Sequence, residues 1–447
     1  MHSAKRLFAA LLCLLPAGVQ AVTLSELGQS ALNNDLSFRA AGKAYEAEQA
    51  EVAAGKSHLL PSVGLSYQNT PYNRLTQRAP VTSQRHYSSH SLNLVVTQPL
   101  FDYTAYHQYR AAQIRGTAAE SRLQIQQAEL INRLVSAYLN LACALELQKT
   151  DRLRLALNTA QLGAAQRLLQ LGEGTVTEVE SARARLRQRQ AQLAETEAES
   201  LNALLILSDL TGLPQLRMQD LPALKAGDFR LPHLNDGDYA AQEQQMQAVH
   251  PEIKAAQQET SLAKAAAEVQ RGAFMPSAQL FAAWSDTRSD SNDTVGQRYR
   301  NLSAGIHLSV PLFSGGKDLA GMRKVSAQIQ QAQYEQDALV QTLRRDLARQ
   351  YQVFRHSGIQ LAALEQAVAA AQLQVTAAEK GYAAGQNSQP EVAHARDQYY
   401  QAEQELTKAR YDGLLAWFRL RHYSSAPETG LFRQIEDYFT VTERPSH

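Results

Sequence analysis

The sequence predicts a mixed, mostly α-helical fold that is elongated and internally duplicated. Two proline-free stretches rich in helix formers support this prediction, and each is long enough for a helix of roughly 70 residues, or about 105 Å. Short motifs around the first stretch recur in the same order around the second, at offsets of 212 to 215 residues. No globular core needs a helix of this length, so we expect a rod-shaped molecule.

The first long helix is predicted from Asp102 to Leu171. Asp102 offers an N-cap, and the glycines of Leu171-Gly172-Glu173-Gly174 end the helix. The residues that follow, Thr175-Val176-Thr177-Glu178, form a capping box that starts another helix, so the chain turns back on itself. Apolar residues in the middle of the long helix follow coiled-coil spacing, which predicts partner helices alongside it. These residues are Ile131, Leu134, Tyr138, Leu141 and Leu145.

Two short alternating segments precede each long helix and are predicted to be β-strands, with one apolar face and one small or polar face. They span residues 62–68, 91–97, 278–284 and 301–310. The polar connections 69–90 and 285–300 are predicted to be loops that point the same way. The second long helix is predicted from 317 to 384, and it turns at Gly385 into a second capping box, Ser388-x-x-Glu391.

The duplication predicts the domain organisation. The first repeat covers 22–214 and the second 239–423, and each holds a helix, two strands, a long helix and a further helix. A linker, 215–238, lies at the equator between them, and the tail, 424–447, is either equatorial or disordered. The matching motifs are Leu60-Pro61-Ser62 with Met275-Pro276-Ser277, Pro99-Leu100-Phe101-Asp102 with Pro311-Leu312-Phe313-Ser314, and Gly172 with Gly385.

Residues 1–21 read as a secretory signal peptide, with a positive start, an apolar run and a Val19-Gln20-Ala21 cleavage pattern. Cys13 lacks the preceding Gly or Ala of a lipoprotein processing site, and Cys143 is the only cysteine beyond the signal, which excludes a disulfide framework within one chain. Lysine plus arginine (44) nearly balances aspartate plus glutamate (43), which argues against a nucleic-acid partner.

After the signal, no apolar run approaches the roughly 20 residues of a membrane-spanning helix, so any membrane crossing must be made by strands. Four strands with an apolar outer face resemble part of a membrane barrel, but four strands cannot close. Open edges would leave backbone groups unpaired in lipid. Several copies must therefore share one wall, with eight strands in a dimer or twelve in a trimer.

The chain resembles the TolC family of outer-membrane export channels. The resemblance rests on the duplicated unit, Pro-Leu-Phe at the start of each long helix, Thr-Gly-Leu-Pro after the helix that ends near Asp209, and the turns Leu-Gly-Glu-Gly-Thr-Val-Thr-Glu-Val and Gly-Tyr-Ala-Ala-Gly. It implies a homotrimer in the Gram-negative outer membrane, with a 12-stranded barrel continued by a periplasmic helical barrel. It also implies a passive duct that works with a periplasmic adaptor and an inner-membrane ABC exporter or proton-driven pump. Type I protein secretion is slightly favoured over drug efflux, and no cofactor is expected.

The resemblance also implies a gate at the helix tips. Tyr382 would face Thr177 and Glu178 to close the tunnel, and Glu391 would supply an acidic ring. Asn387 stands where the family's best-known member has arginine, and His394 where it has a second ring acid, which predicts fewer ionic contacts and a pH-sensitive ring. Helix capping alone is the alternative role for both glutamates, and a place on a helix face is the favoured role for His394. The tip turns would dock the adaptor through Gly172, Glu173, Gly174 and Gly385.

Aromatic residues near the strand ends are candidates for a membrane-interface girdle, with simple packing as the alternative. They are Tyr67, Phe101, Phe281, Trp284 and Phe313. A second function class remains open at this stage: a periplasmic coiled-coil structural or adaptor protein with a soluble sheet domain. An enzyme is the least favoured class, because the sequence shows no nucleophile elbow, phosphate-binding loop or metal-ligand motif.

Overall fold

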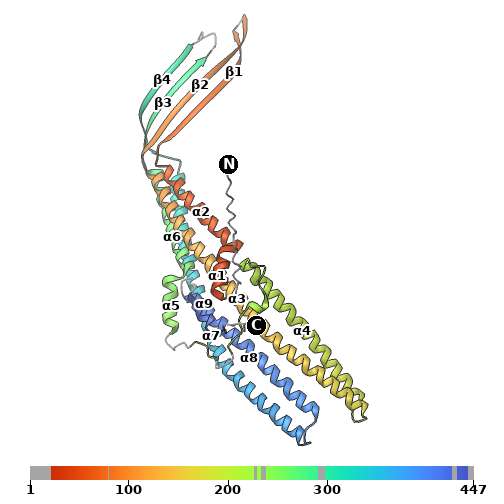
Figure 1. Ribbon diagram of the computed structural model, residues 1–447. Helices are drawn as coiled ribbons and strands as arrows, with labels where there is room; N and C mark the ends of the chain where they lie inside the picture. Colours follow the sequence, from red (N-terminus) through yellow and green to blue (C-terminus); the bar gives the residue numbers. More distant parts are fainter. Residues whose placement is uncertain are drawn as a thin grey trace, which may run out of the picture.

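A computed structural model describes residues 22–78, 80–225, 229–232, 238–289, 297–424 and 430–440. The predicted signal peptide lies outside these residues, as do parts of the linker, of the 285–300 connection and of the C-terminal tail. Figure 1 shows an elongated molecule with a four-stranded sheet at one end and two helical hairpins at the other. The hairpins are the α3–α4 and α7–α8 pairs.

Both halves of the chain contain the same series of elements. The first half holds α1 (Leu24–Asn34), α2 (Leu36–Ser57), β1 (Ser62–Arg78), β2 (Val81–Asp102), α3 (Tyr103–Gln170) and α4 (Val176–Thr211). The second half holds α5 (Asp238–Val249), α6 (Pro251–Arg271), β3 (Ser277–Ser289), β4 (Gln297–Ser309), α7 (Lys317–Ala383), α8 (Gln389–Ser424) and α9 (Gly430–Glu436). Two short 3-10 turns, η1 (Met218–Asp220) and η2 (Gly272–Phe274), complete the described elements.

Both predicted long helices are confirmed, as α3 with 68 residues and α7 with 67. The Asp102 carboxylate caps α3 by accepting a hydrogen bond from the Ala105 N–H at 2.9 Å. Shorter helices pack along each rod: α2 and α4 along α3, α8 along α7, and α6 along both α3 and α7. The predicted helix before each strand pair is confirmed as α2 and α6, and each is preceded by a further short helix, α1 or α5. Asp35 begins α2 by accepting from the Phe38 N–H, and Pro251 occupies the first turn of α6.

The sheet has the order β1-β2-β3-β4, and every pair is antiparallel. The predicted polar loop at 69–90 is wrong, because β1 and β2 continue through it as a paired hairpin up to Arg78 and Val81. Cross-strand contacts stabilise this part, including Tyr72 stacked on Tyr87 with ring centroids 5.0 Å apart. Pro71 lies in β1, an edge strand of this sheet, and edge strands are where proline is usually found in sheets.

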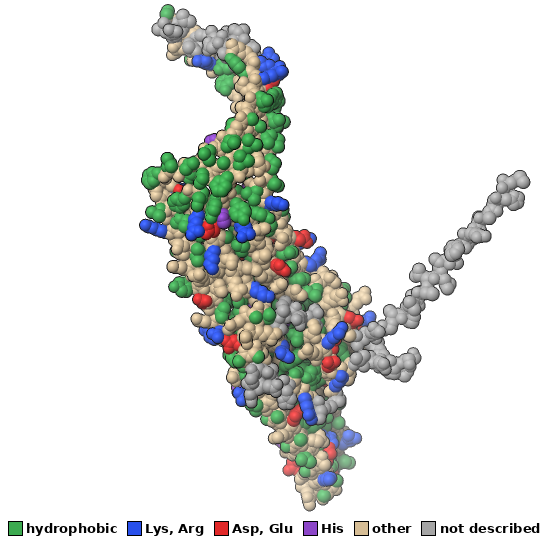
Figure 2. Space-filling model, turned by 90° about the vertical axis from the view of Figure 1, so that its left-hand side faces the viewer, with side chains coloured by type: hydrophobic (Ala, Val, Ile, Leu, Met, Phe, Trp, Pro, Cys, Tyr) green, Lys and Arg blue, Asp and Glu red, His purple; other side chains and the backbone are tan. Residues whose placement is uncertain are grey.

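One face of the sheet is a continuous apolar band. Successive rows across it include Val63 with Val96, Ala282 and Ala304, and then Leu65 with Leu94, Trp284 and Leu302. Leu65 and Leu302 are 70% and 80% exposed, so nothing in one chain covers this face. From Ala278 to Trp284 the apolar rows extend over about 20 Å of strand, against the roughly 25 Å apolar band of outer-membrane barrels. Figure 2 shows hydrophobic side chains gathered over this part of the sheet.

The main hydrophobic core lies at the middle of the molecule, where both halves meet. It joins α1, the centre of α3, the C-terminal part of α8, and α9. Its largest fully buried side chains include Tyr138, Phe418 and Phe432. The C-terminal segment closes this core: Phe439 forms a β-bridge with Leu224 of the linker. Cys143 packs at its edge, where burial raises the pKa of the thiol to about 12. It is therefore a structural rather than a reactive cysteine.

One helix, α3, contains an 18-residue window apolar enough to cross a membrane by length and composition. This differs from the expectation that no such run follows the signal. Since 56% of that window is buried within the chain, its apolar residues belong to the central core. Exposed apolar side chains occur on the sheet, among them Leu65 and Leu302, and also on the helices, among them Leu201 and Leu373.

Candidate functional site at the helix tips

The α3–α4 turn is built by glycine. Gly172 has φ +78°, a left-handed conformation that favours glycine, and it ends α3. The N–H groups of Glu173 and Gly174 both donate to the Leu168 carbonyl, at 2.9 and 3.1 Å. These bonds satisfy the end of the helix and leave Glu173 exposed at the tip. The turn therefore presents a short, well-defined surface at the far end of the molecule.

The predicted capping box at the start of α4 is complete. The Thr175 N–H donates to the Glu178 carboxylate at 2.8 Å, and the Glu178 N–H donates to the Thr175 hydroxyl at 3.3 Å. The backbone hydrogen bond from Thr175 is the main reason that the pKa of Glu178 is lowered. Glu178 therefore stays ionised, and its charge at the helix N-terminus stabilises α4.

The second turn differs in its polar contacts. Gly385 has φ +73°, and the Asn387 side-chain amide donates back to the Ala378 carbonyl at 3.4 Å. Asn387 lies so close to Gly381 that a Cβ at Gly381 would meet its amide at 2.5 Å. Asn387, which stands where the resemblance places an arginine of the closing network, is thus part of the turn itself. Glu391 accepts hydrogen bonds from the Ser388 N–H and hydroxyl, at 2.7 and 3.1 Å.

Tyr382 and Glu178 lie on the two sides of the seam between the hairpins. Tyr382, half exposed, lines a groove of about 230 Å³ with α3 and the start of α8, whereas Thr177 and Glu178 line a groove of about 350 Å³ between α4 and α8. Gln389 contributes to both grooves, so they adjoin. Among the described residues no hydrogen bond joins Tyr382 to Glu178 or Thr177, and their contact stays a prediction.

His394 is exposed on α8, and its Nε2 lies 3.1 Å from the side-chain nitrogen of Gln398, one turn further along. Among the described residues, no side-chain hydrogen bond joins it to the α3–α4 hairpin. In a single chain it is a residue on a helix face. Its part in a ring of three copies stays a prediction.

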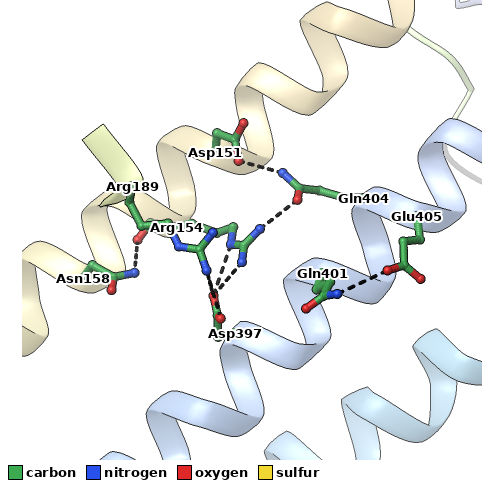
Figure 3. Close-up of polar contacts among 8 residues, drawn as sticks. All are labelled: Asp151, Arg154, Asn158, Arg189, Asp397, Gln401, Gln404 and Glu405. Atoms are coloured by element: carbon green, nitrogen blue, oxygen red, sulfur yellow. Dashed lines mark hydrogen bonds and ion pairs between the residues drawn. The ribbon is translucent and has the colours of Figure 1, made fainter. Parts of the chain in front are cut away.

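A partly buried polar cluster between the hairpins was not anticipated from the sequence (Figure 3). Arg154 of α3, 4% exposed, donates to the Asp397 carboxylate of α8 from Nε and Nη2, at 3.2 and 2.7 Å. Arg189 of α4 donates to the same carboxylate at 2.9 and 3.0 Å. Gln404 of α8 accepts from Arg154 and donates to Asp151, both at 2.7 Å. We call these five residues the hairpin latch.

The hairpin latch ties α8 to both helices of the other hairpin. Arg154 precedes Gly172 by a stretch of helix of about 27 Å, so the hairpin latch lies between the tips and the central core. Its two arginines and two aspartates balance in charge, and the burial of Arg154 and Asp151 makes each partner costly to remove. In the sequence, Arg189 belongs to a basic run that reads as a solvated helix face. Asp397 gives no local signal at all, because its partners are more than 200 residues away.

The aromatic candidates do not all share one face. Tyr67 and Trp284 lie on the apolar face of the sheet, and a bulge between Pro99 and Phe101 brings Phe101 to the same face. Phe281 lies on the opposite face, where it packs against Gly305, because its position is one residue out of phase with Trp284. Phe313 follows β4 outside the sheet and is 88% exposed. A girdle of all five residues on one face is therefore wrong in the case of Phe281.

Among the described residues no group of three or more metal-ligating side chains could hold a metal ion. The chemistry at the tips is that of hydrogen bonds, helix caps and ion pairs. Such contacts can hold two hairpins together or release them.

Comparison with known proteins identifies the family. The family model described as outer membrane efflux protein matches residues 27–213 and 243–425, and each matched segment holds one half of the duplicated fold. The chain is 32% identical to the alkaline protease secretion protein AprF of Pseudomonas aeruginosa, over 98% of this chain and 92% of that protein. It is also 32% identical to the proteases secretion protein PrtF of Dickeya chrysanthemi, over 97% and 94%.

Crystal structures of CusC match the fold with a TM-score of 0.76 at 18% identity, covering 90% of this chain and 92% of that one. The soluble periplasmic alternative is set aside, since relatives and structural neighbours are outer-membrane channels that extend into the periplasm. The chain therefore belongs to the outer membrane efflux protein family, as a TolC-like exit duct in the outer membrane.

Proposed function

We propose that three copies of this chain form one outer-membrane duct for type I protein secretion. The observation that carries the proposal is the open sheet. Its band of exposed apolar side chains suits contact with lipid, yet its edge strands β1 and β4 have no further partner in one chain among the described residues. Unpaired edges in lipid cost several kcal/mol per group, and three sheets of four strands remove all of them by closing a 12-stranded barrel.

The helical hairpins continue this wall into the periplasm. Each chain contributes two hairpins, so three chains give six around a common axis. Apolar side chains remain exposed on the outer helices of one chain, which supports burial against neighbouring copies. Examples are Leu201, Leu205 and Tyr334, with exposures of 54%, 62% and 73%.

The gate of this duct lies at the tips. The two hairpins of one chain meet along a seam of grooves and the hairpin latch, without a large apolar core near the turns. Moving the α7–α8 hairpin away from α3–α4 would open the lower end, while the central core keeps its shape. Thr177, Glu178, Tyr382, Glu391 and His394 would face the closing contacts between copies. The turns at Gly172–Gly174 and Gly385 would contact the periplasmic adaptor.

Protein cargo is favoured over small molecules because two relatives that match nearly the whole chain are named for protease secretion. The inner-membrane partner would then be an ABC exporter, joined through an adaptor. A passive duct needs no catalytic residue, so we infer that the chain acts as a conduit rather than an enzyme.

Two experiments test the assembly and the pathway. The full-length protein should require detergent for extraction from outer membranes and migrate as a heat-sensitive trimer, whereas a soluble monomer would overturn the barrel. Cross-linking in cells should then recover an ABC exporter with the duct. Recovery of a proton-driven pump alone would replace protein secretion by small-molecule efflux and leave the trimer standing.

A separate test concerns the gate. Replacing Tyr382 and Glu178 together by alanine should raise outer-membrane leak of small solutes, because both would lose their closing contacts. Glu178→Gln serves as a matched control, since it keeps the side-chain shape at the start of α4 while removing the charge. Unchanged permeability in the double variant would remove these residues from the gate.

A further inference from the structure

The two halves of the chain repeat the same helices but do not bury them equally. The helices α4 and α8 have 36 residues each, and every α4 residue has its counterpart 213 positions later in α8. Buried apolar positions at the centre of the two long helices follow the same offset. They are Leu130, Leu134 and Leu141 in α3, and Leu343, Leu347 and Phe354 in α7. Each position in one half can therefore be compared with its counterpart in the other.

From the central core to the tips, the helices of the two hairpins form a row with α4 and α7 at its ends. In this row α3 packs against α4 and α8, and α8 packs against α3 and α7. Figure 1 shows α4 and α7 on opposite sides of this part of the molecule. The contact between α3 and α8 joins the first half to the second. By the duplication, its counterpart would join α7 of one chain to α4 of another.

Exposed leucines on α4 lie where this neighbour would pack. In the second half, Leu414 and Phe418 of α8 are fully buried in the central core. Their counterparts in α4, Leu201 and Leu205, are 54% and 62% exposed. Apolar side chains at equivalent positions are thus covered in the second half and open in the first, so α4 offers an apolar surface to a second copy.

The same comparison brings two opposite charges together. His422, in the last turn of α8, donates from Nε2 to the Ala128 carbonyl of α3 at 2.8 Å, and Asn132 lies one turn further along α3 beside the same cavity. The counterpart of His422 is Asp209 in α4, and the counterpart of Asn132 is Arg345 in α7. If α7 packs on a neighbour's α4 as α3 packs on α8, these two charged side chains meet.

Among the described residues, neither charge has an opposite partner within one chain. Asp209 is exposed in the last turn of α4, where the helix dipole disfavours a carboxylate and no basic residue offsets it. Arg345 is exposed on α7 and makes its hydrogen bonds to its own helix, as to the Thr342 hydroxyl at 3.1 Å. The adjacent Asp346 pairs with Arg349 instead. The two edges of the row are therefore complementary in charge.

We propose that α7 of each copy packs against α4 of the next, with Arg345 paired to Asp209 of the partner subunit. This contact rests on the trimer proposed above and specifies which helix edges meet in it. Each copy uses both edges once, so the contact is head to tail and can close into a ring. The leucines of α4 supply the burial, and the ion pair fixes how far the helices are shifted along each other.

Cross-linking of the full-length protein in detergent tests the contact. D209C/R345C, treated with a short bismaleimide reagent, should give covalently linked trimers on a denaturing gel, because each copy offers one cysteine to each neighbour. D209C/R323C is the matched control and should stay monomeric on the gel. Arg323 is also exposed on α7 but lies about 33 Å along the helix from Arg345. The unaltered protein measures any reaction of Cys143.

A charge swap tests the ion pair separately. Asp209→Arg should lower the temperature at which the trimer dissociates by several degrees, because it would face Arg345 of the partner subunit. Adding Arg345→Asp to the same chain should restore most of this loss. Adding Arg323→Asp instead gives the same net charge and should restore none of it.

Three outcomes would overturn the contact. They are a heat-sensitive trimer in which D209C/R345C does not cross-link, equal cross-linking by the control pair, and a charge-swapped protein that is no more stable than Asp209→Arg alone. The first of these leaves the trimer standing with another surface between its copies. A monomer in detergent would instead overturn the trimer itself, so the two failures are distinct.

Discussion

The middle of the molecule and its helix tips are held together in different ways. At the middle, apolar side chains from both halves form one large core that closes within a single chain. Near the tips the buried apolar cluster consists only of Val375, Ala378 and Ala395, all within the α7–α8 hairpin. The link between hairpins there is the polar hairpin latch. A close-packed apolar core resists deformation, whereas ion pairs and hydrogen bonds can exchange partners.

This difference predicts which part of the duct moves. The tips expose Leu171, Leu373 and Tyr382, at 73%, 72% and 51%, and the proposed trimer would bury such side chains against neighbouring copies. The apolar side chains at the middle are already buried within one chain. We therefore expect changes in the core to affect stability, and changes near the tips to affect permeability.

The largest effect should come from Phe432→Ala in α9. Phe432 is 1% exposed and packs directly over Gly28 of α1, so its loss leaves a cavity where the two ends of the chain meet. We expect a loss of about 3–5 kcal/mol and a clearly lower melting temperature in detergent. Phe432→Leu is the control and should cost less than about 1.5 kcal/mol. Equal melting temperatures for the alanine variant and the unaltered protein would show that the tail does not contribute to the core.

The next effect is a pH dependence of the middle. Burial, assisted by the nearby charge of His422, lowers the pKa of His250 to about 4 from 6.5. The folded state thus keeps His250 neutral while the unfolded chain takes up a proton, so stability should fall as pH drops from about 6.5 to 4, by up to about 3 kcal/mol.

Melting curves at pH 7.5 and 5 check this expectation. His250→Gln should lose less stability on acidification than the unaltered protein. His356→Gln, at an exposed site on α7, is the control and should lose as much stability as the unaltered protein. Parallel losses in all three proteins would assign the pH dependence to other groups.

In contrast to the core variants, Asp397→Asn should have a moderate effect on stability and a large effect on the gate. It removes the charge shared by Arg154 and Arg189, and because Asp397 is 37% exposed we expect a loss of about 1–3 kcal/mol. The α7–α8 hairpin should separate more readily, which uptake of a large antibiotic normally excluded by the outer membrane would report.

Glu379→Gln is the matched control for this variant. It breaks the ion pair between Glu379 and Arg396, which joins α7 to α8 within one hairpin. It should therefore leave uptake unchanged. Equal leak in both variants would mean that the hairpin latch has no special part in closure.

The smallest expected effect distinguishes the turn from the helix. Gly385→Ala forces a side chain into φ +73° and should cost about 1 kcal/mol. Gly358→Ala lies within α7 with open space around it, and should instead add about 0.5–1 kcal/mol through helix propensity. Melting temperatures that shift in the same direction would contradict the assignment of Gly385 as an essential turn glycine.

Local signals were sufficient for much of this architecture. The long helices, the Asp102 cap, the Thr175–Glu178 capping box and the turn glycines follow from neighbouring residues, because caps and propensities act over a few positions. The duplication was equally visible, since its motifs recur in order. The extended β1–β2 hairpin was missed because its polar residues and prolines resemble a loop, and cross-strand pairing overrides that composition.

The sequence by itself determined the long helices, the turns and the apolar strand faces. Only the tertiary structure decided which distant side chains meet. The hairpin latch joins Arg154 and Arg189 to Asp397, and the central core joins Gly28 to Phe432, across more than 200 residues in each case. Likewise, strand register placed Phe281 on the face opposite Trp284. Such contacts depend on the packing of whole elements, and no short-range pattern in the chain encodes that packing.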